Sequence, residues 1–352
     1  MAKRSVGIAI LGVGRWGTHL LRNFIEHPYA EVKAIADTSP DHLQRAAERF
    51  NLPPDLIITN QWQAAIATPE VEAVIIVTPA STHTTLIRAA LERNCHVLVE
   101  KPITLSIQDA EDLCTLAQQK ERCLVVDHTY LFHPVVGAGR TVLQDNQLGS
   151  LHYGYASRTH LGPVRPDVDA LWDLAIHDIS IFNHWLGDRP CQAQAVGKSW
   201  LQPESTAPPL FPGGLSDVVW ATLTYPSGFQ ANLHLCWSNP DKQRRLCIVG
   251  SKGTLVFDEM RCDQPLTLLR GHFTQQGAYF IPDGHHHQAI AVEPAEPLQQ
   301  LCTHFLETVL GLTPSQFSVV HSSGVVGTDL IRVLTALSTS LNNGGQAIAI
   351  EY

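Results

Sequence analysis

The segment Ile8 to Gly17, IAILGVGRWG, joins an apolar strand pattern to the motif GxGxxG and the start of a helix pattern. In this motif Gly12 permits a tight turn, Gly14 lets the backbone approach a pyrophosphate, and Gly17 allows close packing of helix on strand. The free N–H groups at the start of such a helix attract phosphate charge. Asp37 follows 20 residues after Gly17, where a carboxylate accepts hydrogen bonds from ribose hydroxyls. The segment therefore predicts a dinucleotide-binding unit.

Asp37 also indicates which dinucleotide is preferred. A carboxylate at this position repels a 2′-phosphate, and Thr38 and Ser39 add no positive charge. We therefore expect NAD rather than NADP, with Arg15 and Trp16 of the glycine turn also contacting the cofactor. The alternative is a glycine turn in an unrelated α/β protein, with Asp37 merely capping the helix that follows.

Two kinds of secondary-structure pattern divide the chain. Up to about residue 125, short β-branched runs alternate with helix patterns, which predicts an α/β Rossmann domain with a doubly wound parallel sheet. After that, strand-like runs joined by turns predict an α+β domain with an open, mostly antiparallel sheet. We expect domains at 1–125 and 126–352, and a C-terminal helix at 323–341 that packs on the first domain. Strands are expected at 6–13, 32–37, 71–78, 96–100, 123–126, 191–201, 218–225, 229–237, 245–250 and 254–258, helices at 14–26, 40–50, 85–93, from 106 and at 169–186, and a long loop at 202–214.

Composition excludes several classes of protein. The 352 residues carry 24 Lys and Arg against 33 Asp and Glu, and the net charge of −9 argues against a nucleic-acid partner. We see no apolar run near the roughly 18 residues of a membrane span and no secretory signal, so we expect no membrane partner and a cytoplasmic location. The eight cysteines form no CxxC pair and are expected to be buried free thiols. The charged fraction of only 16% fits a sheet covered by another subunit, as in a homodimer or homotetramer.

Three further stretches carry a family resemblance: VTPASTH at 77–83, VEKP at 99–102 and DLAIH at 173–177. With the glycine motif, they resemble the Gfo/Idh/MocA family, named after glucose–fructose oxidoreductase, inositol dehydrogenase and a rhizopine-catabolism protein. The resemblance covers essentially the whole chain. It implies that the second domain binds substrate and also forms the oligomer interface.

The resemblance also implies roles for individual residues of the first domain. Thr78, Pro79, His83 and Glu100 would contact the cofactor. Lys101 would lie between the nicotinamide and the substrate hydroxyl. The residues alone agree in part, because Lys101 follows a strand and ligands of open α/β sheets bind beyond the carboxyl ends of the strands.

The segment 172–180, WDLAIHDIS, is expected to be helical, which puts Asp173 and His177 on one face. Oxidation of a secondary alcohol needs a base for the O–H proton, and a histidine oriented by an aspartate can supply it. We expect His177 to accept the proton while Lys101 polarises the same oxygen, and the exchange of these two roles stays open. A capping aspartate and a core histidine are the alternative.

Other polar residues bear on the substrate. Arg158 and Arg165 lie in a stretch rich in Pro and Gly, where we expect a loop that binds a phosphate or carboxylate; surface salt bridges are the alternative. Tyr130 and His128 either line the cleft or belong to the core. Three consecutive histidines at 285–287 cannot all face one ion, so we expect a solvated loop and no metal.

The stretch 127–134, the arginine segment and WDLAIHD together look most like family members that oxidise a ring hydroxyl, often at C3, of a nucleotide-linked sugar. The sequence therefore predicts an NAD(P)-dependent oxidoreductase that transfers a hydride between the nicotinamide and a secondary hydroxyl of a sugar or cyclitol. One alternative is a non-catalytic NAD-binding regulatory protein, which loss of Lys101 or His177 would signal. The other is a reductase of a non-sugar substrate, whose relatives usually depart from the Asp-x-x-x-His pattern.

Overall fold

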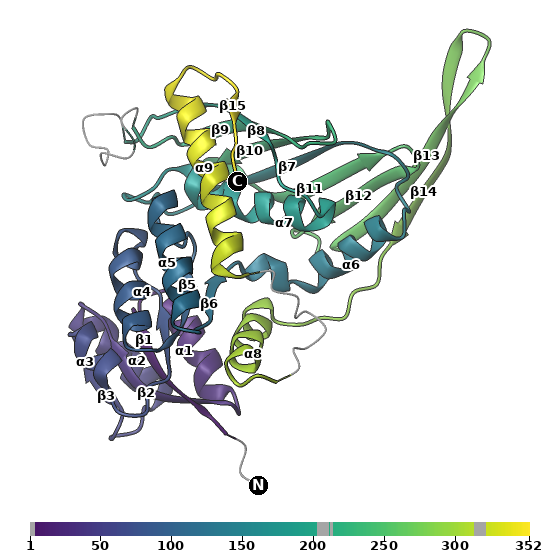
Figure 1. Cartoon of the computed structure of the whole chain (residues 1–352). Coiled ribbons are helices and arrows are strands. Elements are labelled where there is room, and N and C mark those ends of the chain that lie inside the picture. The colour runs from purple at the N-terminus through teal and green to yellow at the C-terminus, as the bar shows by residue number, and fades with distance from the viewer. Residues whose placement is uncertain (1–3, 203–210, 212–213, 313–321) are drawn as a thin grey trace. The chain divides into compact units, whose positions relative to one another are not determined.

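A computed structural model of the chain describes residues 4–202, 211, 214–312 and 322–352 (Figure 1). The chain forms two compact units, the first made of Met1–Phe132 and Ala295–Ile331 and the second of His133–Pro294 and Arg332–Tyr352. The first unit therefore extends past residue 125 and includes a segment from late in the chain, unlike the two continuous domains expected from sequence. The expected loop at 202–214 lies largely outside the described residues.

A parallel sheet forms the centre of the first unit, and in the described part of the chain it has six strands in the order β3-β2-β1-β4-β5-β6. The order reverses direction between β1 and β4, as in doubly wound dinucleotide-binding folds. The expected Rossmann architecture is confirmed. The short edge strand β3 was missed because it is three residues long and its two isoleucines are exposed. The strands are β1 (Val6–Leu11), β2 (Ala30–Ala36), β3 (Ile57–Thr59), β4 (Ala73–Ile76), β5 (His96–Glu100) and β6 (Leu124–Asp127).

Helices flank both faces of this sheet (Figure 1). Local capping explains where two of them begin: Ser39 accepts a hydrogen bond from the His42 N–H, and Ser106 accepts one from the Asp109 N–H. The helical elements of this unit are α1 (Gly17–Glu26), α2 (Pro40–Phe50), α3 (Trp62–Ala67), η1 (Ala80–Thr82), α4 (His83–Glu92), α5 (Ile107–Gln119), η2 (Thr129–Phe132), α8 (Pro297–Val309) and the first turns of α9 (Gly324–Asn342).

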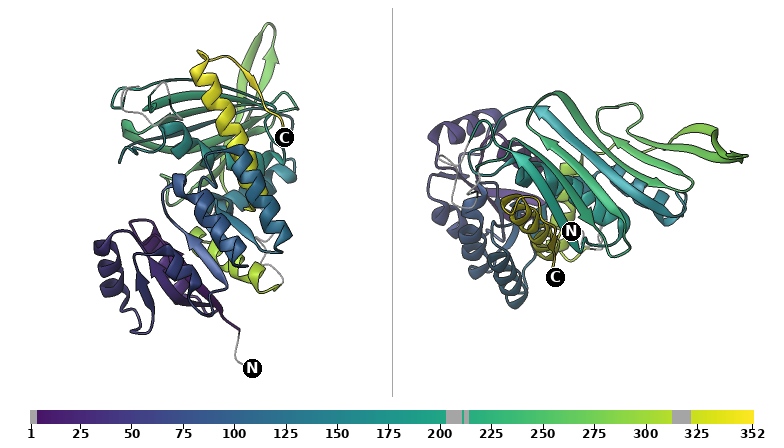
Figure 2. Two further views of the ribbon diagram at one scale, coloured as in Figure 1. Left: turned by 60° about the vertical axis from the view of Figure 1, so that its left-hand side comes forward. Right: turned by 90° about the horizontal axis from the view of Figure 1, so that it is seen from above.

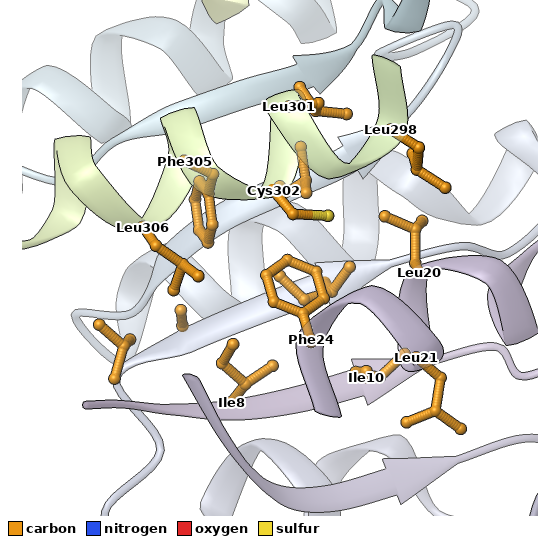
Figure 3. Packing of buried hydrophobic residues seen from close by; sticks show 14 of the residues in the cluster. Ile8, Ile10, Leu20, Leu21, Phe24, Leu298, Leu301, Cys302, Phe305 and Leu306 are labelled. Carbon is orange, nitrogen blue, oxygen red and sulfur yellow. The ribbon is translucent and has the colours of Figure 1, made fainter. Parts of the chain in front are cut away.

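Helix α8 completes the hydrophobic core of the first unit (Figure 3). Its buried face contributes Leu301, Cys302, Phe305 and Leu306. The ring of Phe305 meets that of Phe24 on α1 edge-on, with centroids 6.5 Å apart. Helix α8 was not predicted from the sequence, because its partner surface comes from the opposite end of the chain.

The second unit is built on a sheet that, among the described residues, has nine strands in the order β14-β13-β12-β11-β7-β10-β9-β8-β15. All neighbouring pairs are antiparallel except β10 and β7, which are parallel. This confirms the expected mostly antiparallel sheet. The strands are β7 (Leu151–Leu161), β8 (Gln192–Lys198), β9 (Val218–Thr224), β10 (Gln230–Cys236), β11 (Ser238–Gly250), β12 (Gly253–Asp258), β13 (Leu266–Gln276), β14 (Tyr279–Ala289) and β15 (Ile348–Ala349).

Helices α6 (Pro134–Gln144) and α7 (Ile176–Leu186), with the π-helical turn η3 (Leu171–Ala175), belong to the second unit. Glycines allow close approach: a Cβ on Gly154 of β7 would lie 2.6 Å from the Phe182 ring of α7. Figure 2 shows β13 and β14 as a long hairpin extending past the other strands. The histidines at 285–287 therefore lie on an exposed strand and not on the expected loop.

Two expectations about apolar segments and thiols need correction. Helix α9 has 19 residues, and an 18-residue stretch of it has a mean hydropathy of 1.2, enough by length and composition for a membrane span. In the structure, 56% of this stretch is buried. Core helices share this profile, and Leu330, Leu334 and Leu337 of α9 are buried. All eight cysteines are free, but Cys191 and Cys262 are exposed.

Candidate cofactor and substrate sites

The glycine turn after β1 has the shape that a dinucleotide requires. Gly12 has φ +92°, and a Cβ there would lie 2.3 Å from the Val77 carbonyl oxygen. A Cβ on Gly17 would lie 2.1 Å from the Gly12 carbonyl oxygen, so the turn itself demands both glycines. A Cβ on Gly14 would meet only the His42 ring, at an ordinary 3.5 Å. The surrounding chain therefore does not require glycine at position 14, and the missing side chain leaves room for a ligand.

The start of helix α1 is open to an anion. Its N-cap residue, Trp16, makes no side-chain cap, and the first turn holds no acidic residue. Trp16 and Arg15 are exposed. The N–H groups of this turn therefore have the polarity that a pyrophosphate needs.

Asp37 lies directly after β2 and faces the glycine turn. Its carboxylate accepts hydrogen bonds from the Val13 N–H at 2.9 Å and the Ser39 N–H at 2.9 Å. The His42 Nδ1 atom is 3.2 Å from both carboxylate oxygens. These contacts fix the carboxylate beside a pocket of about 670 Å³ lined by Val13, Gly14, Arg15, Thr18, His42, Arg45, Glu48 and Arg49.

The contribution of α2 to this pocket was not predicted from the sequence. His42, Arg45 and Arg49 are spaced three and four residues apart, so they share one face of the helix. The expected boundaries of this helix were correct. The spacing was therefore the signal that could have identified these residues.

His83, which the resemblance implied as a cofactor contact, lies in the core of the first unit. Its side chain is fully buried, with Nδ1 2.8 Å from the Pro102 carbonyl oxygen and Nε2 2.9 Å from the Thr78 carbonyl oxygen. The buried ring therefore connects the loop after β4 to the loop after β5. Thr78 is half-buried, with its hydroxyl 2.6 Å from that of Thr82, and Pro79 is exposed.

Glu100 and Lys101 lie at the carboxyl end of β5, where ligands of open α/β sheets bind. The backbone N–H of Lys101 donates to Glu100 Oε2 at 3.2 Å. Burial raises the pKa of Glu100 well above its usual value, and the neighbouring Asp127 raises it further. Asp127, the last residue of β6, was not among the predicted site residues, because its proximity to Glu100 follows from the strand pairing.

Burial differs between the two residues after β6 that were expected to lie in either the cleft or the core. His128 is buried, and burial lowers its pKa to about 3, so its ring is neutral and belongs to the core. Tyr130, in η2, is half-buried.

Asp173 lies within an irregular turn of the second unit, and His177 follows directly after it. Asp173 belongs to the π-helical turn η3, and His177 to the first turn of α7, so the helix is not regular as expected. Both residues are half-buried. Single π-helical turns inside helices are frequent at functional sites because they change the direction of side chains.

Asp169 stabilises the start of this turn. It is buried, and its carboxylate accepts a hydrogen bond from the Trp172 N–H at 3.0 Å. Burial raises the pKa of Asp169 to about 7.

Arg165 orients Asp173. Its Nη1 atom donates to Asp173 Oδ1 at 3.1 Å, while Nε and Nη2 bind the Asp167 carboxylate at 2.9 and 2.6 Å. The structure thus brings together two predicted site residues, with the arginine already bound to two carboxylates. His160 of β7, which was not predicted as a site residue, is near this pair. Burial lowers the pKa of His160, and the nearby Asp173 opposes this shift.

Arg158 corrects a sequence prediction. It lies on strand β7, not on a loop, and is 5% exposed. Its Nη2 atom donates to Asp178 Oδ1 at 2.7 Å, and its Nε atom is 3.2 Å from both oxygens of the same carboxylate. Arg158 therefore forms a buried ion pair with α7 and presents no exposed cation to a substrate anion.

The described residues contain no group of three or more His, Cys, Asp and Glu side chains arranged to hold a metal ion. The histidines at 285–287 are exposed along β14. Neighbouring residues of a strand point to opposite faces.

A doubly wound unit with an open glycine turn, followed by a unit built on a large, mostly antiparallel sheet, defines a two-unit dinucleotide-dependent oxidoreductase. Comparison with known families agrees. Residues 6–128 match the family described as "Oxidoreductase family, NAD-binding Rossmann fold", and residues 139–256 match the "GFO/IDH/MocA C-terminal domain". The chain belongs to the Gfo/Idh/MocA family of NAD-binding oxidoreductases.

Two relatives with named activities are similar to this chain. The chain is 30% identical over 227 residues, 64% of either chain, to UDP-N-acetylglucosamine 3-dehydrogenase of Acidithiobacillus ferrooxidans. It is 25% identical over 89% of either chain to the NAD-dependent scyllo-inositol 2-dehydrogenase of Bacillus subtilis. A solved structure of the Acidithiobacillus enzyme superposes with a TM-score of 0.77 at 22% identity, covering 96% of this chain and 98% of that one, and supports the fold.

Proposed function

We propose that the protein is an NAD-dependent dehydrogenase acting on a secondary ring hydroxyl of a sugar or cyclitol, with nucleotide-linked sugars as the first class to test. The observation that carries the proposal is the Arg165–Asp173 pair one turn before His177, in a chain that also carries Lys101 and the Gly14 cradle. The named activities of the two relatives support this substrate class.

When bound, the nicotinamide supplies the hydride acceptor, and the protein supplies binding and proton transfer. The N–H groups after Gly14 bind the pyrophosphate, and Asp37 accepts hydrogen bonds from the ribose hydroxyls. His177 accepts the hydroxyl proton, and Lys101 donates a hydrogen bond to the same oxygen; the exchanged assignment is the alternative. Asp173, held by Arg165, accepts a hydrogen bond from a neighbouring substrate hydroxyl.

The cofactor preference is for NAD over NADP. Asp37 supports this preference because its carboxylate repels a 2′-phosphate, although Arg15, Arg45 and Arg49 bring positive charge to the same pocket. Asp37→Asn removes the charge at constant size. The ratio of kcat/KM for NAD to that for NADP should fall at least about tenfold in this variant, since two unit charges about 4 Å apart near a protein surface interact by about 4 kcal/mol, and a tenfold change needs about 1.4 kcal/mol. A wild-type preference for NADP would contradict the proposal.

The catalytic assignment is tested by following NADH formation with sugars, inositols and nucleotide sugars. His177→Ala should lower kcat at least about 100-fold, the usual contribution of a general base, and leave the NAD dissociation constant unchanged. The exposed His286→Ala is a matched control and should match the wild type in both. Wild-type turnover by His177→Ala would refute the assignment. NAD binding without oxidation of any substrate class would favour the regulatory alternative, and turnover of a non-sugar carbonyl or imine would favour the reductase.

We further propose a cytoplasmic homodimer or homotetramer formed through the open sheet. Val196, Trp220, Tyr153 and Tyr155 support this proposal because they are exposed on neighbouring strands of that sheet. Light scattering after size-exclusion chromatography tests it. Trp220→Glu should shift the mass toward that of one chain, whereas the wild type at the mass of a monomer would contradict it.

A further inference from the structure

One face of strand β7 lies along helix α7 and the turn η3 that precedes it. Alternate residues of a strand point to the same face, so Gly154, Arg158 and His160 share this side of the sheet. A Cβ on Gly154 would lie 2.6 Å from the Phe182 ring, and Arg158 Nη2 donates to Asp178 Oδ1 at 2.7 Å. The contacts therefore move toward the start of the helix as β7 proceeds toward its end. His160 is next in this series, beside η3 and the first turn of α7.

The helical segment beside His160 carries two of the proposed site residues. Within residues 171–180, Asp173 and His177 are partly exposed, and the other eight residues are buried. His160 is also partly exposed. The charge of Asp173 acts on the His160 ring, which agrees with the position that the strand contacts indicate. His160 therefore belongs with Asp173 and His177.

The backbone opposite His160 departs from the regular ladder. The register between β11 and β7 shifts at this point, and residues 239–242 of β11 face the single residue His160. The Thr159 hydroxyl donates to the Asp241 carbonyl oxygen at 2.6 Å, which holds this bulge in place. Bulges are frequent next to active sites because they turn side chains in a new direction.

The contacts of the His160 ring determine which of its nitrogens carries a proton. Burial and the nearby Arg244 lower its pKa, so near pH 7.5 the ring is neutral and has one N–H. Its Nδ1 atom is buried and has no hydrogen-bond partner among the described residues, and a buried N–H without an acceptor is rare because it is costly. A Cβ on Gly162 would lie 2.5 Å from Nε2, so this glycine makes room for the opposite edge of the ring. The proton therefore belongs on Nε2.

We propose that His160 is a further substrate-binding residue, whose Nε2–H donates a hydrogen bond to the oxygen of the hydroxyl that donates to Asp173. The inference rests on the proposed function, because it takes Asp173 to bind the hydroxyl next to the one that is oxidised. A hydroxyl both donates and accepts, so one group satisfies the carboxylate and the N–H together. The substrate is then a vicinal diol. An ether at the second position cannot donate to Asp173, and a deoxy carbon binds neither residue.

The first experiment needs no turnover. Proton–nitrogen correlation spectra of the histidine rings at pH 7.5 distinguish a proton on Nδ1, a proton on Nε2 and the doubly protonated ring. His160→Gln identifies the signals of His160 by their loss. We expect a neutral ring with its proton on Nε2. A doubly protonated ring, or a proton on Nδ1, would overturn the donor role whether or not the protein is a dehydrogenase.

The second experiment compares the diol that the wild type oxidises best with its analogue deoxygenated at the neighbouring carbon. His160→Leu removes the donor at similar size, and it should reduce the preference for the diol about threefold to tenfold, the contribution of one hydrogen bond, through KM more than through kcat. His160→Gln keeps an N–H donor and should retain most of the preference. The matched control is His152→Leu, which changes an exposed histidine at the start of the same strand and should behave as the wild type.

An unchanged preference in His160→Leu would overturn the inference. An equal loss in His160→Leu and His160→Gln would also overturn it, because the loss would then not depend on the donor. Failure of the wild type to form NADH with any diol would instead contradict the proposed function. Calorimetric titration of the NAD-loaded protein with the same diols then decides the role of His160, and equal affinities of the wild type and His160→Leu would overturn it.

Discussion

Replacing Asp178 by alanine should destabilise the second unit far more than the loss of an ordinary surface ion pair. The Asp178 and Arg158 side chains are 3% and 6% exposed, and they join α7 to β7. Without Asp178, the guanidinium stays buried and loses its carboxylate counter-ion. The chain can relieve this only by opening the contact between helix and sheet.

The magnitude follows from burial. Exposed ion pairs contribute about 0–1 kcal/mol. Removing one partner of a buried pair costs about 3–5 kcal/mol, because the other charge remains desolvated. Replacing both partners by apolar residues of similar size is close to neutral. We therefore expect about 3–5 kcal/mol for Asp178→Ala or Arg158→Met alone, and about 0–1 kcal/mol for Arg158→Met combined with Asp178→Leu.

Urea unfolding followed by circular dichroism measures these free energies. The matched control is Glu259→Ala, which breaks a pair with Arg244 that is about one-third exposed and should cost about 1 kcal/mol or less. The reasoning is refuted if Asp178→Ala costs no more than this control, or if the double variant is as unstable as the single ones.

Three further predictions concern the core, the cofactor site and pH. Phe305→Ala should lower the free energy of unfolding by about 3–5 kcal/mol through the cavity it leaves against α1, and near-wild-type stability in a denaturant titration would contradict the packing. Gly14→Ala should weaken NAD binding at least tenfold in calorimetry while leaving the melting temperature within about 2 °C, since its Cβ meets only the His42 ring, and unchanged affinity would exclude this glycine from the site. The pKa of Asp169 is raised from 3.8 to about 7, so the folded protein keeps a proton that the unfolded chain releases, and wild-type stability should fall between about pH 4 and pH 7 by up to about 4 kcal/mol. Asp169→Asn cannot titrate and should lack this fall in urea titrations at several pH values; a parallel pH profile would count against a buried, protonated Asp169.

The sequence was sufficient to predict the ends of an element where neighbouring residues define those ends. The helix 40–50 was predicted at its observed ends because Ser39 caps it and Pro40 fits its first turn. The strand 96–100 was also predicted at its observed ends, as a short apolar run before the Glu-Lys-Pro sequence. The glycine turn and Asp37 could be predicted together because both belong to one βαβ unit.

Other features depend on partners that are distant in sequence. Arg158 was expected on a loop because nearby prolines and glycines dominate the local pattern, whereas β7 forms through pairing with β10 and β11. Asp127 gains significance only beside Glu100 on the neighbouring strand. The site residue His83 was selected by motif, but the two carbonyl groups that bind its ring lie in separate loops.

The late position of α8 in the chain has a consequence for how the protein is made. The ribosome releases the strands and helices of the nucleotide-binding sheet first. The apolar surface of Phe24 and Leu20 on α1 stays uncovered until α8, which ends at Val309, has been synthesised. A nascent chain of 132 residues therefore exposes a hydrophobic surface that chaperones and proteases recognise. Premature termination before this helix should yield a chain that is degraded, not a smaller protein that still binds NAD.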